Sequence, residues 1–303
     1  MASVGGTWCL PVRSALHRLC ESDPVTDWLA PPDELMVLTT ERLRLVEVEA
    51  PRLSAEEQNL TNRAWDDALL AQPSMFDGSV AASGGLAREG PDGLVLAWIR
   101  TTYRRYVLRK VPGATCWLPH LFVSILQPTD DERLLVGRMA SWTAAPGRWQ
   151  LPSGTGEPPK AEGEPLDVDG LRALAARELR EETGTEAAPE DLGLQCLVLS
   201  TQGDVGVLFH APPRPVTSLR DQYASLLEAE KARGHDPELD QIAFVSAPGD
   251  LAALDGPTAD YLALVLDRHG QHGQHGQQGL GRAGRETGPG TPTGPRAETA
   301  GSG

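Results

Sequence analysis

Three glutamates near the middle of the chain, Glu178, Glu181 and Glu182, have the residue type and spacing to hold a metal ion. We expect a helix over residues 168–183, and positions i, i+3 and i+4 place these carboxylates on one face of it. A helix C-terminus already carries partial negative charge, and Gly184 is the residue type that ends a helix. The spacing predicts a site for Mg²⁺ or Mn²⁺, which prefer oxygen ligands. The alternative is a solvated, charged helix face.

The residues ahead of the glutamates extend the pattern. The loop Leu151-Pro152-Ser153-Gly154 is followed by Gly163, by Asp169 six positions later, and by Arg177 eight positions after that. This spacing resembles the Nudix box, in which Gly, five residues, Glu and seven residues precede R-E-apolar-x-E-E-x-G-apolar. The chain has Asp169 in place of Glu and Thr185 in place of an apolar residue, and it matches at Gly163, Arg177, Glu178, Leu179, Glu181, Glu182 and Gly184.

The resemblance implies an α/β fold, a Nudix-type α/β/α sandwich with a mixed sheet, and hydrolysis of a diphosphate on divalent metal ions. It implies that Glu178, Glu181 and Glu182 are metal ligands, with Glu181 also catalytic. It also implies that Arg177, Asp169 and Gly163 are structural, with Arg177 paired to the upstream carboxylate. The family usually runs L-P-G-G directly into the box, whereas here Ser153 replaces a Gly and extra residues intervene. Glu164 is therefore an alternative to Asp169 as that partner.

Water attack on a diphosphate also needs a general base. In many members of the family, a glutamate in a loop ahead of a late strand binds a metal ion or acts as the general base. Glu238 occupies such a loop here. We therefore predict that Glu238 is catalytic, with Asp236 and Asp240 as competitors and an ordinary acidic turn as the alternative.

The residues around the expected loop at 151–154 are candidates for binding the substrate. Arg138 and Arg148 flank it and can pair with phosphate oxygens, so we predict that they and Gly154 bind the substrate. The alternative for each arginine is an ordinary surface position. Trp142 and Trp149 can stack on a base, although packing under the loop is the more common role. We expect His120 to be a core or edge histidine.

Composition excludes several classes of function. The chain has 303 residues, 40% of them hydrophobic, and a net charge of −15, which disfavours binding to a nucleic acid polymer. Its longest apolar runs are too short for a bilayer span, so we expect no membrane partner and a cytoplasmic location. The four cysteines lack C-x-x-C spacing, which predicts reduced thiols. The expected partner is a small nucleotide substrate, and the protein is expected to be a monomer or homodimer.

The pattern of strands, helices and turns divides the chain into four parts. We expect an irregular N-terminus at 1–32, an N-terminal α+β extension at 33–112, a Nudix hydrolase domain at 113–269, and a disordered low-complexity tail at 270–303. His269, His272 and His275 recur near this tail, and we expect low-complexity drift there rather than a metal site. The expected elements are strands at 36–48, 94–103, 117–127, 132–141, 194–202, 205–211 and 242–246, and helices at 54–71, 168–183, 218–233 and 258–268. Ser54 and Glu57 predict a capping box at the start of the first helix, and residues 128–131 (PTDD) have the composition of a hairpin turn.

A second resemblance lies in the extension, in residues 64–77 (AWDDALLAQPSMFD) and 101–104 (TTYR). These segments resemble the region ahead of the Nudix domain in animal UDP-glucose/UDP-galactose diphosphatases, which favours a UDP-sugar as substrate. Individually, we expect Trp65, Leu69 and Phe76 to pack on the sheet.

Together these features predict metal-dependent hydrolysis of a nucleoside diphosphate linked to another moiety. One alternative is a Nudix module that senses a nucleotide without cleaving it, which the intact glutamate trio disfavours. Another is a diphosphate isomerase, for which Cys116 and Cys196 have no recognisable partner motif.

Overall fold

The computed structural model describes residues 27–73, 75–114, 116–161 and 163–271. Most of the N-terminus expected at 1–32, and the tail beyond residue 271 with His272 and His275, lie outside these ranges. Within them the chain has mixed α/β structure, with helices packed on mixed sheets, which confirms the predicted fold class. No helix in these ranges is both long and apolar enough to cross a membrane.

The N-terminal part of the described chain builds a sheet in the order β1-β4-β5-β3. Its strands are β1 (Asp27–Trp28), β3 (Arg42–Val48), β4 (Ser79–Glu89) and β5 (Gly93–Thr102), with the short 3₁₀ helix η1 (Tyr103–Lys110) after them. The helix α2 (Ala55–Ala71) begins with the expected capping box. In it, the Glu57 N–H donates to Ser54 Oγ at 3.2 Å, and the Ser54 N–H donates to Glu57 Oε2 at 2.8 Å.

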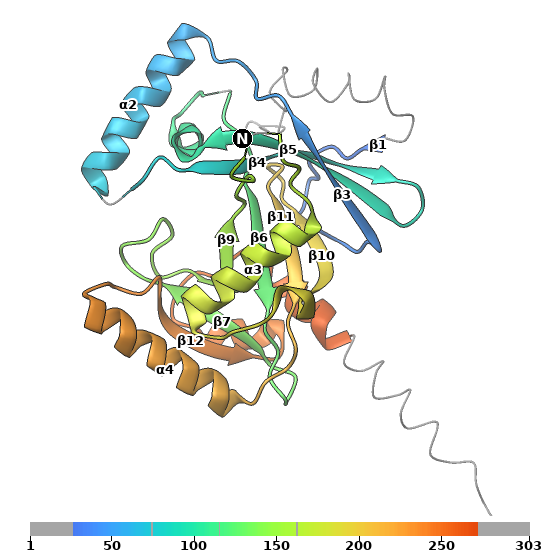
Figure 1. The fold of residues 1–303 in the computed structure, drawn as a ribbon, viewed down its shortest axis with the longest axis vertical. Coiled ribbons are helices and arrows are strands. Elements are labelled where there is room, and N and C mark those ends of the chain that lie inside the picture. Colours follow the sequence, from blue (N-terminus) through green and yellow to red (C-terminus); the bar gives the residue numbers. More distant parts are fainter. Residues whose placement is uncertain (1–26, 74, 115, 162, 272–303) are drawn as a thin grey trace, which may run out of the picture.

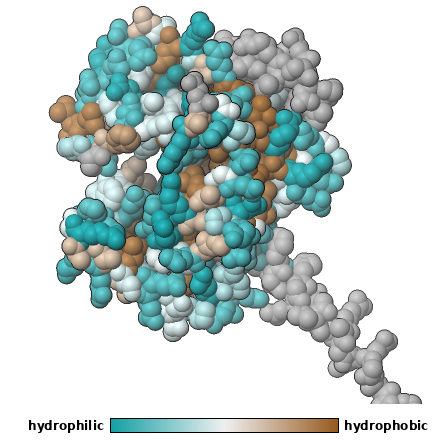
Figure 2. Space-filling model, viewed as in Figure 1, coloured by the Kyte–Doolittle hydropathy of each residue, from teal (hydrophilic) through white to brown (hydrophobic). Residues whose placement is uncertain are grey.

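The end of α2 is unusually apolar at the surface. Trp65 is buried, as expected, but Phe76 is 80% exposed and Leu70 is 83% exposed. The prediction that Phe76 packs on the sheet is therefore wrong, because its side chain is mostly in contact with solvent. Figure 2 shows hydrophobic atoms at the edge of the molecule where α2 lies, next to a largely hydrophilic surface.

The single strand expected over 36–48 is divided in two. The first piece, β2 (Met36–Leu38), pairs with a strand of the central sheet, while β3 pairs with β5. Thr40 stabilises the break, because its hydroxyl donates to the carbonyl oxygens of Arg42 at 2.6 Å and Asp92 at 2.9 Å.

The central sheet is mixed, in the order β2-β10-β11-β6-β9. Its other strands are β6 (Leu121–Leu126), β9 (Ser153–Thr155), β10 (Gly193–Leu199) and β11 (Val205–His210), of which β6 and β11 run parallel. A third, antiparallel sheet has the order β12-β7-β8 and consists of β7 (Leu134–Met139), β8 (Trp149–Gln150) and β12 (Leu239–Val245). The expected turn between β6 and β7 forms, yet the two strands enter different sheets.

Helices cover both faces of the central sheet. The helix α3 (Val168–Thr183) packs on one face and is drawn in front of the sheet in Figure 1. Alternate residues of β11 show the two sides, since Val205, Val207 and Phe209 share a core with α3 while Leu208 packs with the helix at 262–271. This is the layered arrangement that the sequence predicts.

The N-terminal sheet is fastened directly to the central sheet. Ala82 in β4 bridges to His120, and the Ala81 N–H donates to the Gly156 carbonyl oxygen at 2.7 Å. Arg109 in η1 binds both carboxylate oxygens of Asp204 at 2.7 and 2.8 Å. These contacts join the extension to the central sheet.

Candidate active site

The helix α3 presents the three glutamates at its C-terminal end. Asp167 caps its start by accepting the Gly170 N–H at 2.8 Å, and Gly184 ends it with φ of 71°, as the sequence predicts. A Cβ at Gly184 would lie 2.6 Å from the carbonyl oxygen of Gln222. Gln222 belongs to the helix α4 (Val216–Arg233), so the glycine also allows α4 to approach the acidic turn.

The strand β9 positions two of the glutamates. The Ser153 N–H donates to Glu182 Oε2 at 2.9 Å, and the Glu182 side chain is buried. A methyl group added at Gly154 would overlap the carboxyl group of Glu178. The glycine that we predicted as a substrate contact is therefore required to admit Glu178, a packing role that spacing alone does not reveal.

Arg177 pairs with a carboxylate that the sequence did not single out. Its guanidinium binds Glu157 at 2.6 and 3.2 Å, and it also reaches Glu178 at 3.2 Å. Asp169 instead binds Arg172 one helical turn away, so the predicted Arg177–Asp169 pair is wrong. Glu157 follows Gly154 by three residues, and the inserted segment before Gly163 obscured this relation. Gly163 has φ of 86°, which fits a turn in that segment.

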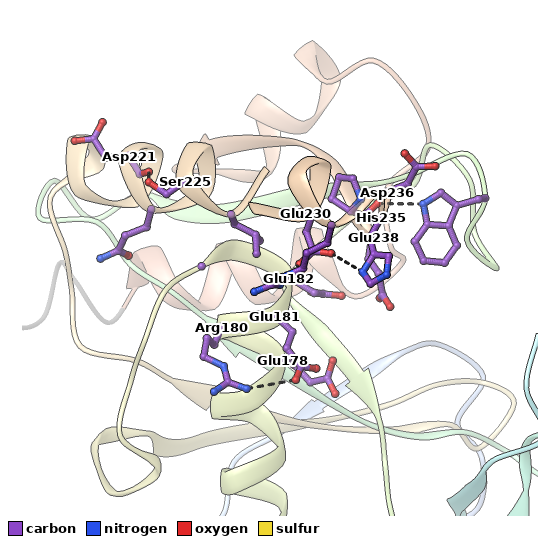
Figure 3. Close-up of a pocket in the computed structure, with 16 residues that line it drawn as sticks. Glu178, Arg180, Glu181, Glu182, Asp221, Ser225, Glu230, His235, Asp236 and Glu238 are labelled. Carbon is purple, nitrogen blue, oxygen red and sulfur yellow. Dashed lines mark hydrogen bonds and ion pairs between the residues drawn. The ribbon is translucent and has the colours of Figure 1, made fainter. Parts of the chain in front are cut away.

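An open recess of about 980 Å³ joins the glutamates to α4 and to the loop before β12. Figure 3 shows Glu178, Glu181 and Glu182 on α3, with the loop that carries His235, Asp236 and Glu238 on the opposite side of the recess. The structure thus brings the predicted base Glu238 to the predicted metal ligands, although Glu238 lies 56 positions after Glu182 in the sequence.

The carboxylates in the recess perturb one another. Burial raises the pKa of Glu178 to about 7, against the lowering effect of Arg177, and the charges of Glu181 and Glu238 add to the rise. Burial also raises the pKa of Glu182 well above its usual value, and the same neighbours contribute. Glu238 is solvent-accessible, yet desolvation in the recess, followed by the charge of Glu181, raises its pKa. A cation bound among them would relieve this repulsion.

In the described part of the chain, no three acidic, His or Cys side chains already form a cluster that could hold a metal ion. Glu178 is held by Arg177 and Glu182 by the Ser153 N–H, while Glu181 is 53% exposed. The donor chemistry nevertheless suits a hard divalent ion, since the groups are crowded oxygen ligands on one recess.

The predicted substrate arginines do not line this recess. Arg138 binds Asp240 at 2.7 Å, and Arg148 donates to Gln150 at 2.8 Å. Two arginines that we did not predict, Arg180 and Arg233, line it instead. The sequence could have predicted Arg180 at the recess, because Arg180 precedes Glu181 on α3. It could not have predicted Arg233, which lines the recess only because α4 packs against α3.

No protein-family model and no curated protein matches the chain. Several solved structures are similar to it. A MutT protein from Methanosarcina mazei Go1 is 18% identical, with a TM-score of 0.35, and the match covers 52% of this chain and 96% of that one. A NUDIX hydrolase from Nitrosomonas europaea is 19% identical, with a TM-score of 0.31 and coverage of 51% and 90%.

A bifunctional NMN adenylyltransferase/ADP ribose pyrophosphatase from Francisella tularensis, complexed with AMP and a Mn ion, is 13% identical. Its TM-score is 0.32, and the match covers 71% of this chain and 48% of that one. At such identities and TM-scores the likeness carries no conclusion about activity, which has to come from the residues in the recess.

Proposed function

We propose that this protein hydrolyses the diphosphate bond of a nucleoside diphosphate linked to another moiety, using Mg²⁺ or Mn²⁺. The observation that carries the proposal is the convergence of Glu178, Glu181, Glu182 and Glu238 on one recess. Glu178, Glu181 and Glu182 would hold the metal ions. Bound metal ions would neutralise phosphate oxygens and acidify a water, which is the chemistry that an anionic substrate needs.

The protein's own groups have three tasks in this reaction. The backbone at Ser153 and Gly154 orients Glu182 and Glu178, and Arg177 keeps Glu178 in place while bound to Glu157. Arg180 and Arg233 line the recess and would face phosphate oxygens. Glu238 would accept the proton of the attacking water, and its raised pKa suits a base that works near neutral pH.

The sugar nucleotide UDP-glucose or a related UDP-sugar is the substrate class that we favour. Support comes from the resemblance in residues 64–77 and 101–104 and from where these residues lie. Gln72 Nε2 donates to the Trp142 carbonyl oxygen at 2.5 Å, and Trp142 lines the recess. Tyr103 is near enough to Glu238 for its charge to raise the tyrosine pKa further, after burial. The extension therefore lies next to two residues that line the recess.

The test is the substitution Glu182→Gln, assayed on a panel of nucleotide sugars, dinucleotides and dinucleoside polyphosphates with each metal ion. Turnover should fall by more than the roughly 10–100-fold that is typical when a residue supporting a metal ligand is lost. The melting temperature should stay equal or rise, because a neutral amide replaces a desolvated carboxylate. Glu190→Gln, an exposed site on the 3₁₀ helix η2 (Pro189–Asp191), is the matched control and should retain activity.

Two results would contradict the proposal. Full activity in the Glu182→Gln variant would show that Glu182 is not a required metal ligand. Nucleotide binding without cleavage of any compound in the panel by the wild-type protein would favour the sensing module instead.

A further inference from the structure

Trp142 is the aromatic residue that the structure places at the glutamates. Its side chain is 39% exposed and lines the same recess as Glu178, Glu181 and Glu182. Trp149, seven positions later, is 1% exposed, and its indole N–H donates to the Asp255 carbonyl oxygen. The sequence left open whether each tryptophan packs under the loop or stacks on a base. In the structure Trp149 packs in the core, whereas Trp142 lines the recess.

Trp142 is held in place once at its ring and once at its backbone. Its indole N–H donates to the Pro237 carbonyl oxygen at 3.1 Å, and its own carbonyl oxygen accepts from Gln72 at 2.5 Å. Because the indole N–H is already bonded, the ring offers its apolar π face rather than a hydrogen bond. A large aromatic side chain that is fixed and exposed has little ordering entropy left to lose when a ligand stacks on it.

The residues that line the recess differ between its two ends. Among the described residues that line it, Trp142 is the only Trp, Tyr or Phe. Figure 3 shows Asp221 and Ser225 of α4 at the end away from His235 and Asp236, with the glutamates between. One end therefore offers the carboxylate of Asp221 and the hydroxyl of Ser225, whereas the end at Pro237 carries the indole that is bonded to it.

We propose that Trp142 is the platform on which the nucleobase of the substrate stacks. This inference rests on the proposed function for the identity of the ligand. The diphosphate lies over the glutamates, and the hydroxyl-bearing sugar extends toward Asp221 and Ser225. Stacking recognises the π face that every base shares, so Trp142 selects for an aromatic ring at one end of the diphosphate and tolerates different bases.

The experiment measures equilibrium binding by titration calorimetry, without turnover. The probes are UMP, AMP and GMP, which carry a base, and inorganic diphosphate, which carries none. The variants are Trp142→Ala, which removes the ring, and Trp142→Phe, which keeps a ring but loses the N–H to Pro237. We expect Trp142→Ala to weaken nucleotide binding roughly tenfold, Trp142→Phe to stay within about threefold of wild type, and diphosphate binding to be equal in all three.

Three outcomes would overturn the proposal. Equal weakening in the Phe and Ala variants would show that the bond to Pro237 matters rather than the ring. Equal weakening for inorganic diphosphate would show a general disturbance of the recess. If none of the three nucleotides bound the wild-type protein, a nucleotide could not be the ligand that stacks on Trp142. A wild-type protein that binds nucleotides through Trp142 but cleaves nothing would instead refute only the proposed hydrolysis.

Discussion

His120 gives a quantitative prediction about the joint between the N-terminal and central sheets. Its ring lies 4.0 Å from the Tyr106 ring, centroid to centroid, and its backbone N–H donates to Asp204. Burial lowers the pKa of His120 to about 4, from 6.5, and the positive charges of Arg109, Arg148 and Lys110 reinforce this against the charge of Asp204. We therefore expect a neutral imidazole in the folded protein at neutral pH.

The sign and size of the effect follow from the two pKa values. The folded-state pKa is the lower one, so this contribution to stability is fully present above about pH 6.5 and is lost as the pH falls toward 4. The difference, 6.5 minus about 4, is about 2.5 pH units, and at about 1.4 kcal/mol per unit this corresponds to about 3 kcal/mol. Asp204 stays ionised over most of this range, because the bond to Arg109 lowers its pKa although burial alone would raise it.

The perturbation is His120→Phe, which keeps a ring against Tyr106 and the backbone bond to Asp204 but removes the titrating group. The free energy of unfolding would be measured by urea denaturation between pH 7.5 and pH 4 for both proteins. Glu178 and Glu182 titrate in the opposite sense, since their folded-state pKa values are raised, so the measured quantity is the difference between wild type and variant. That difference should shift against the wild type by about 3 kcal/mol on acidification. Parallel curves would refute the reasoning.

Two further predictions concern the supports of the glutamates. Gly154→Ala should displace the Glu178 carboxyl group and lower kcat/KM about a hundredfold, whereas Gly193→Ala, at a glycine with open space around it, should have no effect in the same assay. Unchanged activity in Gly154→Ala would show that Glu178 is free to move. Glu157→Gln should lower kcat/KM by roughly 10–100-fold because Arg177 loses its charged partner, and Asp169→Asn should leave it near wild type. The reverse ranking would restore the Asp169 assignment.

The sequence by itself determined the elements whose signals are local. The limits of α3, its end at Gly184 and the capping box of α2 all agree with expectation, because caps and helical periodicity depend on residues within a few positions of each other. The same locality put Glu178, Glu181 and Glu182 on one turn. Each of these features depends on local backbone geometry and not on contacts with distant segments.

Only the tertiary structure decided which distant groups meet that turn. The choice of Glu157 over Asp169 depends on the path of residues 155–167, which have no periodic pattern to predict it. The separation of β6 from β7 depends on which partner strands, β11 and β12, they find. Trp142 and Trp149 have the same chemistry, and burial by the surrounding elements distinguishes them. Such outcomes arise from long-range packing, in which many segments compete for one surface and no short stretch of sequence records the result.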